Sequence, residues 1–72
     1  MNRMRIAESI LVYRRTRNIT QKQFGALVGV SGQAVYKWEK ELCCPDISLL
    51  PTLSAILGVS VATLLGCNDS EL

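Results

Sequence analysis

The sequence predicts an all-α fold of five helices. One pattern occurs three times, at residues 19–24, 30–35 and 59–64: an apolar residue precedes a serine or threonine, and a second apolar residue follows four positions after that hydroxyl. A hydroxyl at this place caps a helix, and the two apolar side chains form a hydrophobic staple around it. No segment has the alternation of apolar and polar residues that is typical of a half-buried strand.

The first helix is predicted at about residues 3–17. Ile6, Ile10 and Tyr13 recur at the spacing of one helix face, so we expect them to form its buried stripe. Arg15 lies opposite that stripe, and its side chain should therefore remain in water.

The second helix is predicted at residues 21–28, with Thr20 as its cap. Gln23 stands at the third helical position, where its side chain can bond the backbone N–H of Thr20 and complete a capping box. Gly29 should end this helix, because the residue that closes a helix often needs a positive φ, which glycine adopts without strain. The side chains expected to point inward are Phe24, Leu27 and Val28.

The third helix is predicted at about residues 32–41, with Ser31 as its cap. Only Val30 separates this cap from Gly29, so the second and third helices must turn sharply and pack on one another. Residues 20–40 therefore form a predicted helix-turn-helix unit.

A breaker segment at residues 43–46 should follow, since Pro45 disfavours a helical conformation for the residue before it. Ser48 is the expected cap of a fourth helix, with Pro51 in the first turn, where a missing N–H has no cost. The residues expected to point inward are Leu53, Ile56 and Leu57, and Gly58 should end the helix.

A short fifth helix should begin after Ser60 and reach Leu65, before Gly66 ends it. We therefore expect one domain at residues 1–66 and a short acidic tail at 67–72. Apolar residues make up 49% of the chain, which favours a folded protein. No apolar run approaches about 18 residues and the start lacks the features of a signal peptide, so the expected compartment is the cytoplasm.

The net charge of +2 hides a strong division. Residues 1–40 contain all eight basic residues against Glu8 and Glu39, a balance of +6, whereas residues 41–72 contain four acidic residues and no basic one. Lysines and arginines that neutralise phosphates release counterions, so a basic half indicates a polyanionic partner. A run of charge is more often just a solvated surface. The division of charge therefore supports a nucleic-acid partner only together with the helix-turn-helix pattern.

Several chemistries are not expected. The chain has no histidine and an odd number of cysteines, Cys43, Cys44 and Cys67, so it has neither a disulfide framework nor a convincing zinc site. We expect reduced thiols, no metal and no cofactor. No nucleophile stands beside a base and no phosphate-cradling loop is present, so the chain is not expected to be an enzyme.

The third helix has two different faces at 100° per residue. Val35, Trp38, Glu39 and Leu42 fall on one side, and the long polar side chains of Gln33, Tyr36, Lys37 and Lys40 fall on the other. Glutamine can pair with adenine, lysine can donate to guanine, and tyrosine offers a hydroxyl and an apolar contact to thymine. Ordinary solvent exposure is the alternative, but the tight turn and the basic half-domain favour DNA.

Glu39 stands on the apolar face, where a carboxylate is costly unless it is paired. Arg14 flanks the buried stripe of the first helix and is the expected partner, so the pair would join the first and third helices. The alternative is a hydrated Glu39 at the rim of the core. The predicted core anchors are Phe24, Val35, Trp38 and Leu53.

Phosphate contacts are predicted at the start of the second helix, where unpaired N–H groups favour an anion. Gln21 and Lys22 occupy this first turn beside Thr20, and Lys40 stands at the other end of the unit. Arg3 and Arg5 are further candidates, for phosphate or minor-groove contacts.

With these residues in hand, the chain resembles the Cro/CI-type (XRE-like) helix-turn-helix family, whose members have the lambda-repressor-like fold. The resemblance covers about residues 6–66. Its signature consists of Arg14, Thr20-Gln21, Phe24-Gly25, Gly29-Val30-Ser31, Val35, Trp38-Glu39, Pro45, Leu53, Leu57-Gly58-Val59-Ser60 and Leu64-Leu65-Gly66.

The resemblance implies a compact five-helix DNA-binding domain whose third helix enters the major groove, in a prokaryotic or phage setting. It implies base contacts from Gln33, Tyr36 and Lys37, with Gly32 close to the DNA backbone, and a structural Arg14–Glu39 ion pair. Two departures stand out: Glu41 occupies a position where the family usually has glycine, and Gly25 replaces a more usual alanine.

The expected function is a sequence-specific DNA-binding transcriptional regulator, most simply a repressor, that acts as a homodimer on a palindromic operator. The expected dimer surface includes Leu49, Leu50, Val61 and Leu65, unless all four belong to the core. The alternatives are an antitoxin-like or protein-interaction module with the same fold, and a thiol sensor that uses Cys43 and Cys44.

Overall fold

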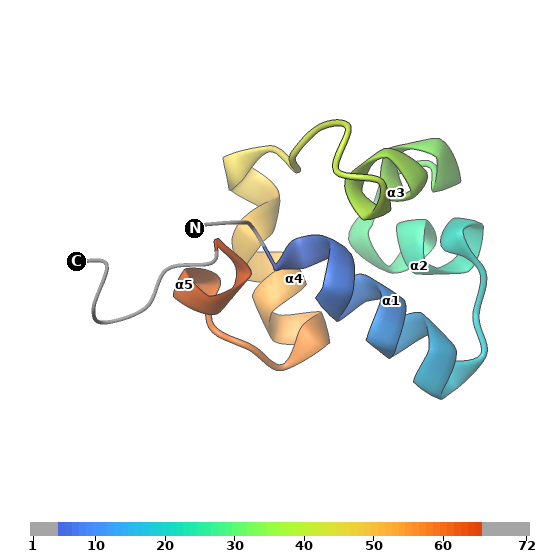
Figure 1. Ribbon diagram of the computed structural model, residues 1–72, viewed down its shortest axis with the longest axis horizontal. Coiled ribbons are helices and arrows are strands. Elements are labelled where there is room, and N and C mark those ends of the chain that lie inside the picture. The colour runs from blue at the N-terminus through green and yellow to red at the C-terminus, as the bar shows by residue number, and fades with distance from the viewer. Residues whose placement is uncertain (1–4, 66–72) are drawn as a thin grey trace.

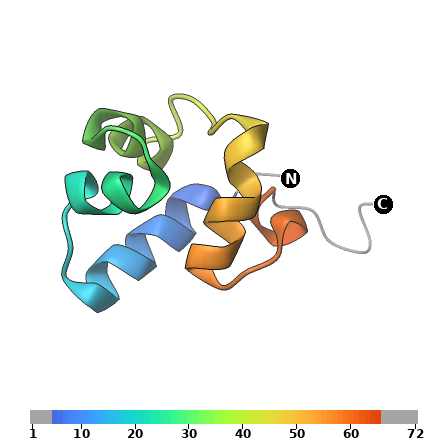
Figure 2. The same ribbon diagram turned by 180° about the vertical axis from the view of Figure 1, so that it is seen from behind.

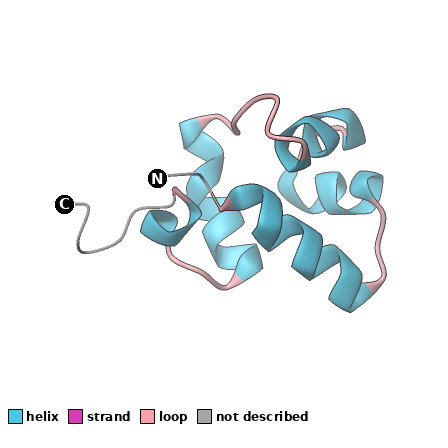
Figure 3. Ribbon diagram, in the orientation of Figure 1, coloured by secondary structure: helices cyan, strands magenta, loops and turns pink. Residues whose placement is uncertain are grey.

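The computed structural model describes residues 5–65, which form five α-helices and one short 3-10 helix (Figures 1 and 3). The elements are α1 (Ile6–Arg17), α2 (Gln21–Val28), α3 (Gly32–Glu39), the 3-10 helix η1 (Ile47–Leu49), α4 (Leu50–Leu57) and α5 (Val61–Leu64). These residues include no strand, so the all-α prediction is confirmed. None of these helices is both long and apolar enough to span a membrane.

Helix α1 lies between two helix pairs, with α2 and α3 on one side and α4 and α5 on the other (Figures 1 and 2). It begins at Ile6, later than predicted, because Arg5 leaves the helical conformation and its N–H donates to the carbonyl of Leu64, 2.9 Å away. Residue 3 lies outside the described part of the chain. The predicted stripe is confirmed, since Ile6 and Ile10 are buried and Tyr13 packs against the core.

The start of α2 is the predicted capping box. The Thr20 hydroxyl accepts the N–H of Gln23 at 3.0 Å, and the Gln23 side chain accepts the N–H of Thr20 at 2.8 Å. Gly29 ends the helix with a φ of 93°. The inner face is narrower than predicted, because Leu27 is 53% exposed while Phe24 and Val28 are buried, so the assignment of Leu27 to the core was wrong.

Helix α3 begins as predicted, with the Ser31 hydroxyl accepting the N–H of Ala34. It ends at Glu39, two residues before the predicted end, since Lys40 caps it and Glu41 takes a positive φ of 59°. Glu41 therefore adopts the conformation for which glycine is usually chosen. Because the chain has left the helix before residue 42, Leu42 does not continue the apolar face and is 67% exposed, which corrects the prediction.

The start of α4 differs from the prediction. Ser48 lies inside η1 and its hydroxyl donates to the Asp46 carboxylate at 2.7 Å, so Ser48 does not cap α4. Leu49 precedes α4 without a side-chain cap, and Pro51 occupies the first turn as expected. Of the predicted inward residues Leu53 is fully buried, while Ile56 and Leu57 pack against the core from its edge, and Gly58 ends the helix with a φ of 73°.

Helix α5 is the short helix that was predicted, capped by the Ser60 hydroxyl, which accepts the N–H of Thr63 at 3.0 Å. Leu65 follows its last residue, and Gly66 with the 67–72 tail lies outside the described residues. All described helices except η1 contribute to one apolar core. Its members are Ile6, Ile10, Phe24, Val28, Val35, Trp38, Leu50, Leu53 and Leu64.

Candidate nucleic-acid interface

Helix α3 separates buried anchors from exposed polar side chains. Val35 is fully buried and Trp38 is 5% exposed, so one face of the helix is held in the core. The opposite face carries four exposed side chains, which we call the α3 strip: Gln33, Tyr36, Lys37 and Lys40. The ammonium of Lys40 lies 5.9 Å from the centre of the Tyr36 ring, so the two side chains are neighbours on this surface. The predicted division of α3 into two faces is therefore present.

The α2–α3 turn places backbone directly against backbone. The amides of Gly29 and Val30 both donate to the carbonyl of Gly25, at 2.8 and 2.9 Å. A Cβ atom added at Gly25 would lie 2.6 Å from the Val30 carbonyl oxygen, closer than real Cβ contacts allow. The glycine at this position thus permits a closer turn than the alanine that the resemblance would favour.

The first residue of α3 is also packed closely on α2. A Cβ atom at Gly32 would lie 3.1 Å from the Cα atom of Lys22, in the first turn of α2. The amino-terminal ends of the two helices are therefore adjacent. This contact brings the N–H groups that begin α3 next to the predicted phosphate contacts of α2.

A charged cluster joins α1, α2 and α3 behind the α3 strip. Arg14 donates from Nε to Oε2 of Glu39 at 2.7 Å and from Nη2 to Oε1 at 2.9 Å, so the predicted ion pair is bidentate. The Arg14 Nη1 also donates to the carbonyl of Ile19 at 3.2 Å. Gln21 completes the cluster, because its Nε2 donates to Oε1 of Glu39 at 2.8 Å.

This cluster satisfies a carboxylate that is almost removed from water, since the Glu39 side chain is 5% exposed. The hydrogen bond to Glu39 raises the pKa of Arg14 above its ordinary value; desolvation opposes this rise and the charge of Glu39 adds to it. Arg14 therefore stays protonated at any physiological pH. Such bidentate pairs fix geometry as well as charge, so the cluster sets the position of α3 relative to α1 and α2.

Gln21 has a role that the sequence did not reveal. It was predicted to contact phosphate, but it is half-buried and one of its two amide hydrogens is directed to Glu39. One amide hydrogen remains for a phosphate. No periodic pattern connects residues 21 and 39, and the one available signal was the demand of a buried carboxylate for more than one donor.

The other residues predicted to contact phosphate do not all lie on one surface. Thr20 and Lys22 are exposed at the start of α2, and Lys40 is exposed at the end of α3. Arg5 is exposed, but its backbone is hydrogen-bonded to α5, so the structure does not bring it into the same group. Arg3 lies outside the described residues.

A helix-turn-helix family model (HTH_3) matches residues 10–64. Two solved structures are similar to the chain. One is the P22 c2 repressor protein in complex with synthetic operator 9T in the presence of Tl+, with a TM-score of 0.75 and 33% identity over 88% of this chain and 96% of that one. The other is the DNA-binding domain of the P22 c2 repressor in solution, with a TM-score of 0.71 and 35% identity over 92% and 87%. No curated protein sequence matches the chain.

Proposed function

We propose that this chain, which belongs to the helix-turn-helix family, is a sequence-specific DNA-binding transcriptional regulator, and specifically a repressor that inserts α3 into the major groove. The α3 strip carries this proposal, because its long polar side chains are exposed while the reverse face of the helix is anchored by Val35 and Trp38. The similar P22 c2 repressor in complex with an operator supports the assignment to repression. A cytoplasmic setting and a working domain at residues 1–66 form part of the same proposal.

Three members of the α3 strip are proposed to contact bases. Gln33 suits the paired donor and acceptor of adenine, and Lys37 suits the two acceptors of guanine. Tyr36 is 45% exposed and presents a hydroxyl with an apolar ring, which suits a thymine methyl group. Gly32 at the start of α3 adds no side chain there, so the backbone of α3 can approach the DNA backbone closely.

Phosphate contacts are proposed to fix the orientation of α3 in the groove. Thr20, Gln21 and Lys22 lie at the amino-terminal end of α2, where the helix dipole and free N–H groups attract an anion, and Lys40 lies at the far end of α3. Arg3 and Arg5 are additional candidates. Contacts of this kind position the protein and carry no sequence information directly.

We further propose that two copies bind a palindromic operator. Half-sites one helical turn apart are about 34 Å from centre to centre, and the longest dimension of one copy is 35 Å, so neighbouring copies can touch. The dimer surface expected from the sequence is replaced here by another. Leu50 belongs to the core, and Leu49, Val61 and Leu65 pack against it. Leu42 and Ile47, which are 67% and 78% exposed in the segment after α3, are the better contact.

Selection of bound sequences from a random DNA pool, followed by gel-shift titration on the selected site, tests this function. We expect one palindromic or pseudo-palindromic consensus and an affinity that falls with salt, with a slope of about −0.9 for each phosphate neutralised. A slope near zero, or a pool without a consensus, would reject the proposal. Titration of the Ile47→Asp variant on the full site and on a single half-site distinguishes loss of dimerisation from loss of DNA binding. We expect this variant to bind the full site more weakly and the half-site with unchanged affinity.

A further inference from the structure

The first turn of α2 is fixed to α3 at two points. At the start of α3, Gly32 leaves so little space that an added Cβ atom would lie 3.1 Å from the Cα atom of Lys22. At the end of α3, Glu39 accepts the side-chain N–H of Gln21 at 2.8 Å. Gly32 and Glu39 are seven residues apart, about two helical turns, and so lie on the same side of α3. A shift of α3 would therefore carry the start of α2 with it or break these contacts.

The hydrogen bond to Glu39 gives the Gln21 amide one orientation. A carboxylate only accepts hydrogen bonds, so the amide must turn its nitrogen, and not its oxygen, toward Glu39. The second hydrogen on that nitrogen remains as a donor, and Gln21 is half-buried rather than enclosed. A side chain held in this way loses less rotamer freedom on binding than a free surface glutamine does. Gln21 is thus pre-organised as a donor to an anion.

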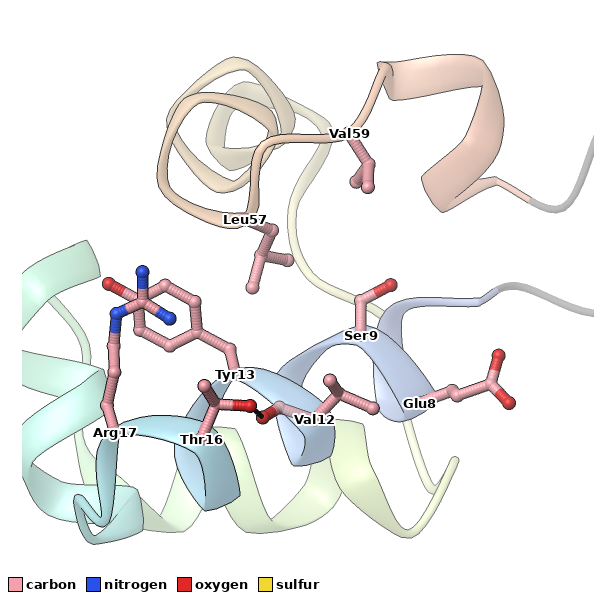
Figure 4. Close-up of a pocket in the computed structure, with 8 residues that line it drawn as sticks. All are labelled: Glu8, Ser9, Val12, Tyr13, Thr16, Arg17, Leu57 and Val59. Atoms are coloured by element: carbon pink, nitrogen blue, oxygen red, sulfur yellow. Dashed lines mark hydrogen bonds between the residues drawn. The ribbon is translucent and has the colours of Figure 1, made fainter.

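Glu39 can hold Gln21 because Glu39 is itself held. Its side chain is 5% exposed, and Arg14 donates to both of its oxygens, at 2.7 and 2.9 Å. A second cation of α1, Arg17, is directed elsewhere: its guanidinium lies 3.9 Å from the centre of the Tyr13 ring, in a groove between α1 and the α4–α5 connection (Figure 4). Arg14 is the α1 cation that reaches α3, and it leaves the carboxylate little freedom to move.

We propose that Gln21 couples a phosphate contact at the start of α2 to the placement of α3, and so contributes to the choice between operator and unrelated DNA. This inference rests on the DNA-binding function proposed above. An amide N–H bonds an oxygen only over a narrow range of distance and angle. Because Gln21 is fixed to α3, its N–H meets an operator phosphate only when α3 is seated correctly in the groove. Phosphate contacts carry no sequence information directly, but this one acquires it through Glu39.

Lys22, the next residue of α2, provides the contrast. Its side chain is exposed and ends in an ammonium on a flexible stem, so it can follow a phosphate that changes position. Its attraction is that of a point charge and depends little on how α3 is seated. Lys22 should therefore strengthen binding to every DNA sequence, whereas Gln21 should strengthen binding to the operator above all.

Gel-shift titrations of the full chain on the selected operator and on an unrelated duplex of equal length test this contrast. Gln21→Met keeps the length of the side chain and removes its hydrogen bonds. It should weaken operator binding by about tenfold for each bound copy, and binding to the unrelated duplex by less than about twofold. Lys22→Met is the matched control: it should weaken both to a similar extent and reduce the salt slope by about 0.9. The salt slope of Gln21→Met should equal that of the unmodified chain, because the amide is neutral.

Two further measurements test the role of Glu39. In an NMR spectrum of the isotope-labelled chain without DNA, one hydrogen of the Gln21 side-chain amide should be shifted downfield by its bond to the carboxylate. Glu39→Gln should weaken operator binding by about fivefold in the chain that has Gln21, and by less than about twofold in the Gln21→Met chain, since the two residues act in one contact. Thermal unfolding checks that each variant keeps its fold. The NMR measurement uses the unmodified chain, so it tests the bond even if Glu39→Gln unfolds.

Three results would each overturn the proposal. The first is a Gln21→Met variant that loses affinity equally on both duplexes, which is the result expected of a merely structural residue. The second is an equal effect of Glu39→Gln with and without Gln21, and the third is a Gln21 amide whose two hydrogens resonate as in a solvated glutamine. In all three cases the unmodified chain still binds its operator, so the proposed DNA binding would stand. An unmodified chain that selects no operator would instead reject the proposed function, and the role of Gln21 with it.

Discussion

Helices α3 and α4 have the same length of eight residues and use their sequences differently. In α4 the larger side chains, Leu50, Leu53, Ile56 and Leu57, belong to the core or pack against it, and the exposed positions carry Pro51, Thr52 and Ala55. In α3 the side chains of Val35 and Trp38 are buried in the core. The exposed positions Gln33, Tyr36 and Lys37, with Lys40 at the C-cap, carry long polar groups.

The comparison separates packing from function. Stability accounts for nearly every side chain of α4, because its exposed positions carry only small ones. The outer face of α3 has no comparable structural explanation, since exposed long polar side chains add little to the free energy of unfolding. We therefore expect substitutions in α4 to change stability and substitutions on the α3 strip to change binding.

The largest expected effect is in the interior face of α4. Leu53→Ala should lower the free energy of unfolding by about 3 kcal/mol, because Leu53 is fully buried and its truncation leaves a cavity. Urea denaturation followed by circular dichroism measures the change. Thr52→Ala on the exposed face of the same helix is the control, with an expected change within about 0.5 kcal/mol. Equal losses of unfolding free energy in the two variants would contradict the distinction between the buried and exposed faces of α4.

The α3 strip should show the opposite behaviour. Gln33→Ala and Lys37→Ala should each weaken binding to the selected operator by about tenfold to a hundredfold, the value of one specific base contact, with the unfolding transition nearly unchanged. Thr52→Ala in α4 should leave binding unchanged. Gel-shift titration at fixed salt measures these affinities. If both α3 variants bind as the unmodified chain does, the strip is an ordinary solvated surface.

The Arg14–Glu39–Gln21 cluster sharpens the comparison, because α3 depends on it and α4 does not. Arg14→Met should cost about 2 kcal/mol of stability, since it removes two hydrogen bonds to a carboxylate that stays buried. Arg15→Met, beside it and exposed, should cost far less. Thermal unfolding compares the two variants. No difference between them would mean that Glu39 is satisfied without Arg14.

The smallest predicted effect concerns the turn before α3. Gly25→Ala should destabilise the chain by about 1 kcal/mol, because the close approach to the Val30 carbonyl outweighs the better helix propensity of alanine. Gly32→Ala meets the Cα atom of Lys22 at 3.1 Å and should be milder. Chemical denaturation of the two variants compares these costs. A stabilised Gly25→Ala variant would show that the turn has room for the methyl group.

The comparison also explains what the sequence could predict. The start of α3 follows from a local signal, because Ser31 has a hydroxyl in the right place and the glycine before it ends α2. The start of α4 does not, since Asp46 and Ser48 form a 3-10 turn whose bonds compete with the expected cap. Both serines follow an apolar residue, but only Ser31 has a second apolar residue four positions later, and only Ser31 caps a helix.

Errors of burial have one common cause. Leu27 and Leu42 were assigned to inward faces from periodicity, which gives the direction of a side chain and not whether another element covers it. The assignment of Leu42 also depended on a third helix that reaches residue 41. Glu41 instead takes a positive φ, which glutamate rarely adopts and which its residue type therefore does not predict. The Arg14–Glu39 pair was predictable because a buried carboxylate demands a cation, whereas its third partner, Gln21, required the fold.

The measurement that tests the central claim most directly is an NMR titration of the isotope-labelled chain with the selected operator. We predict that the largest chemical-shift changes fall on the backbone and side chains of Gln33, Tyr36 and Lys37, with smaller changes at Lys22 and Lys40 and little change along α4. Shifts concentrated on α4 or α1, with α3 unaffected, would contradict the assignment of α3 as the helix that contacts bases.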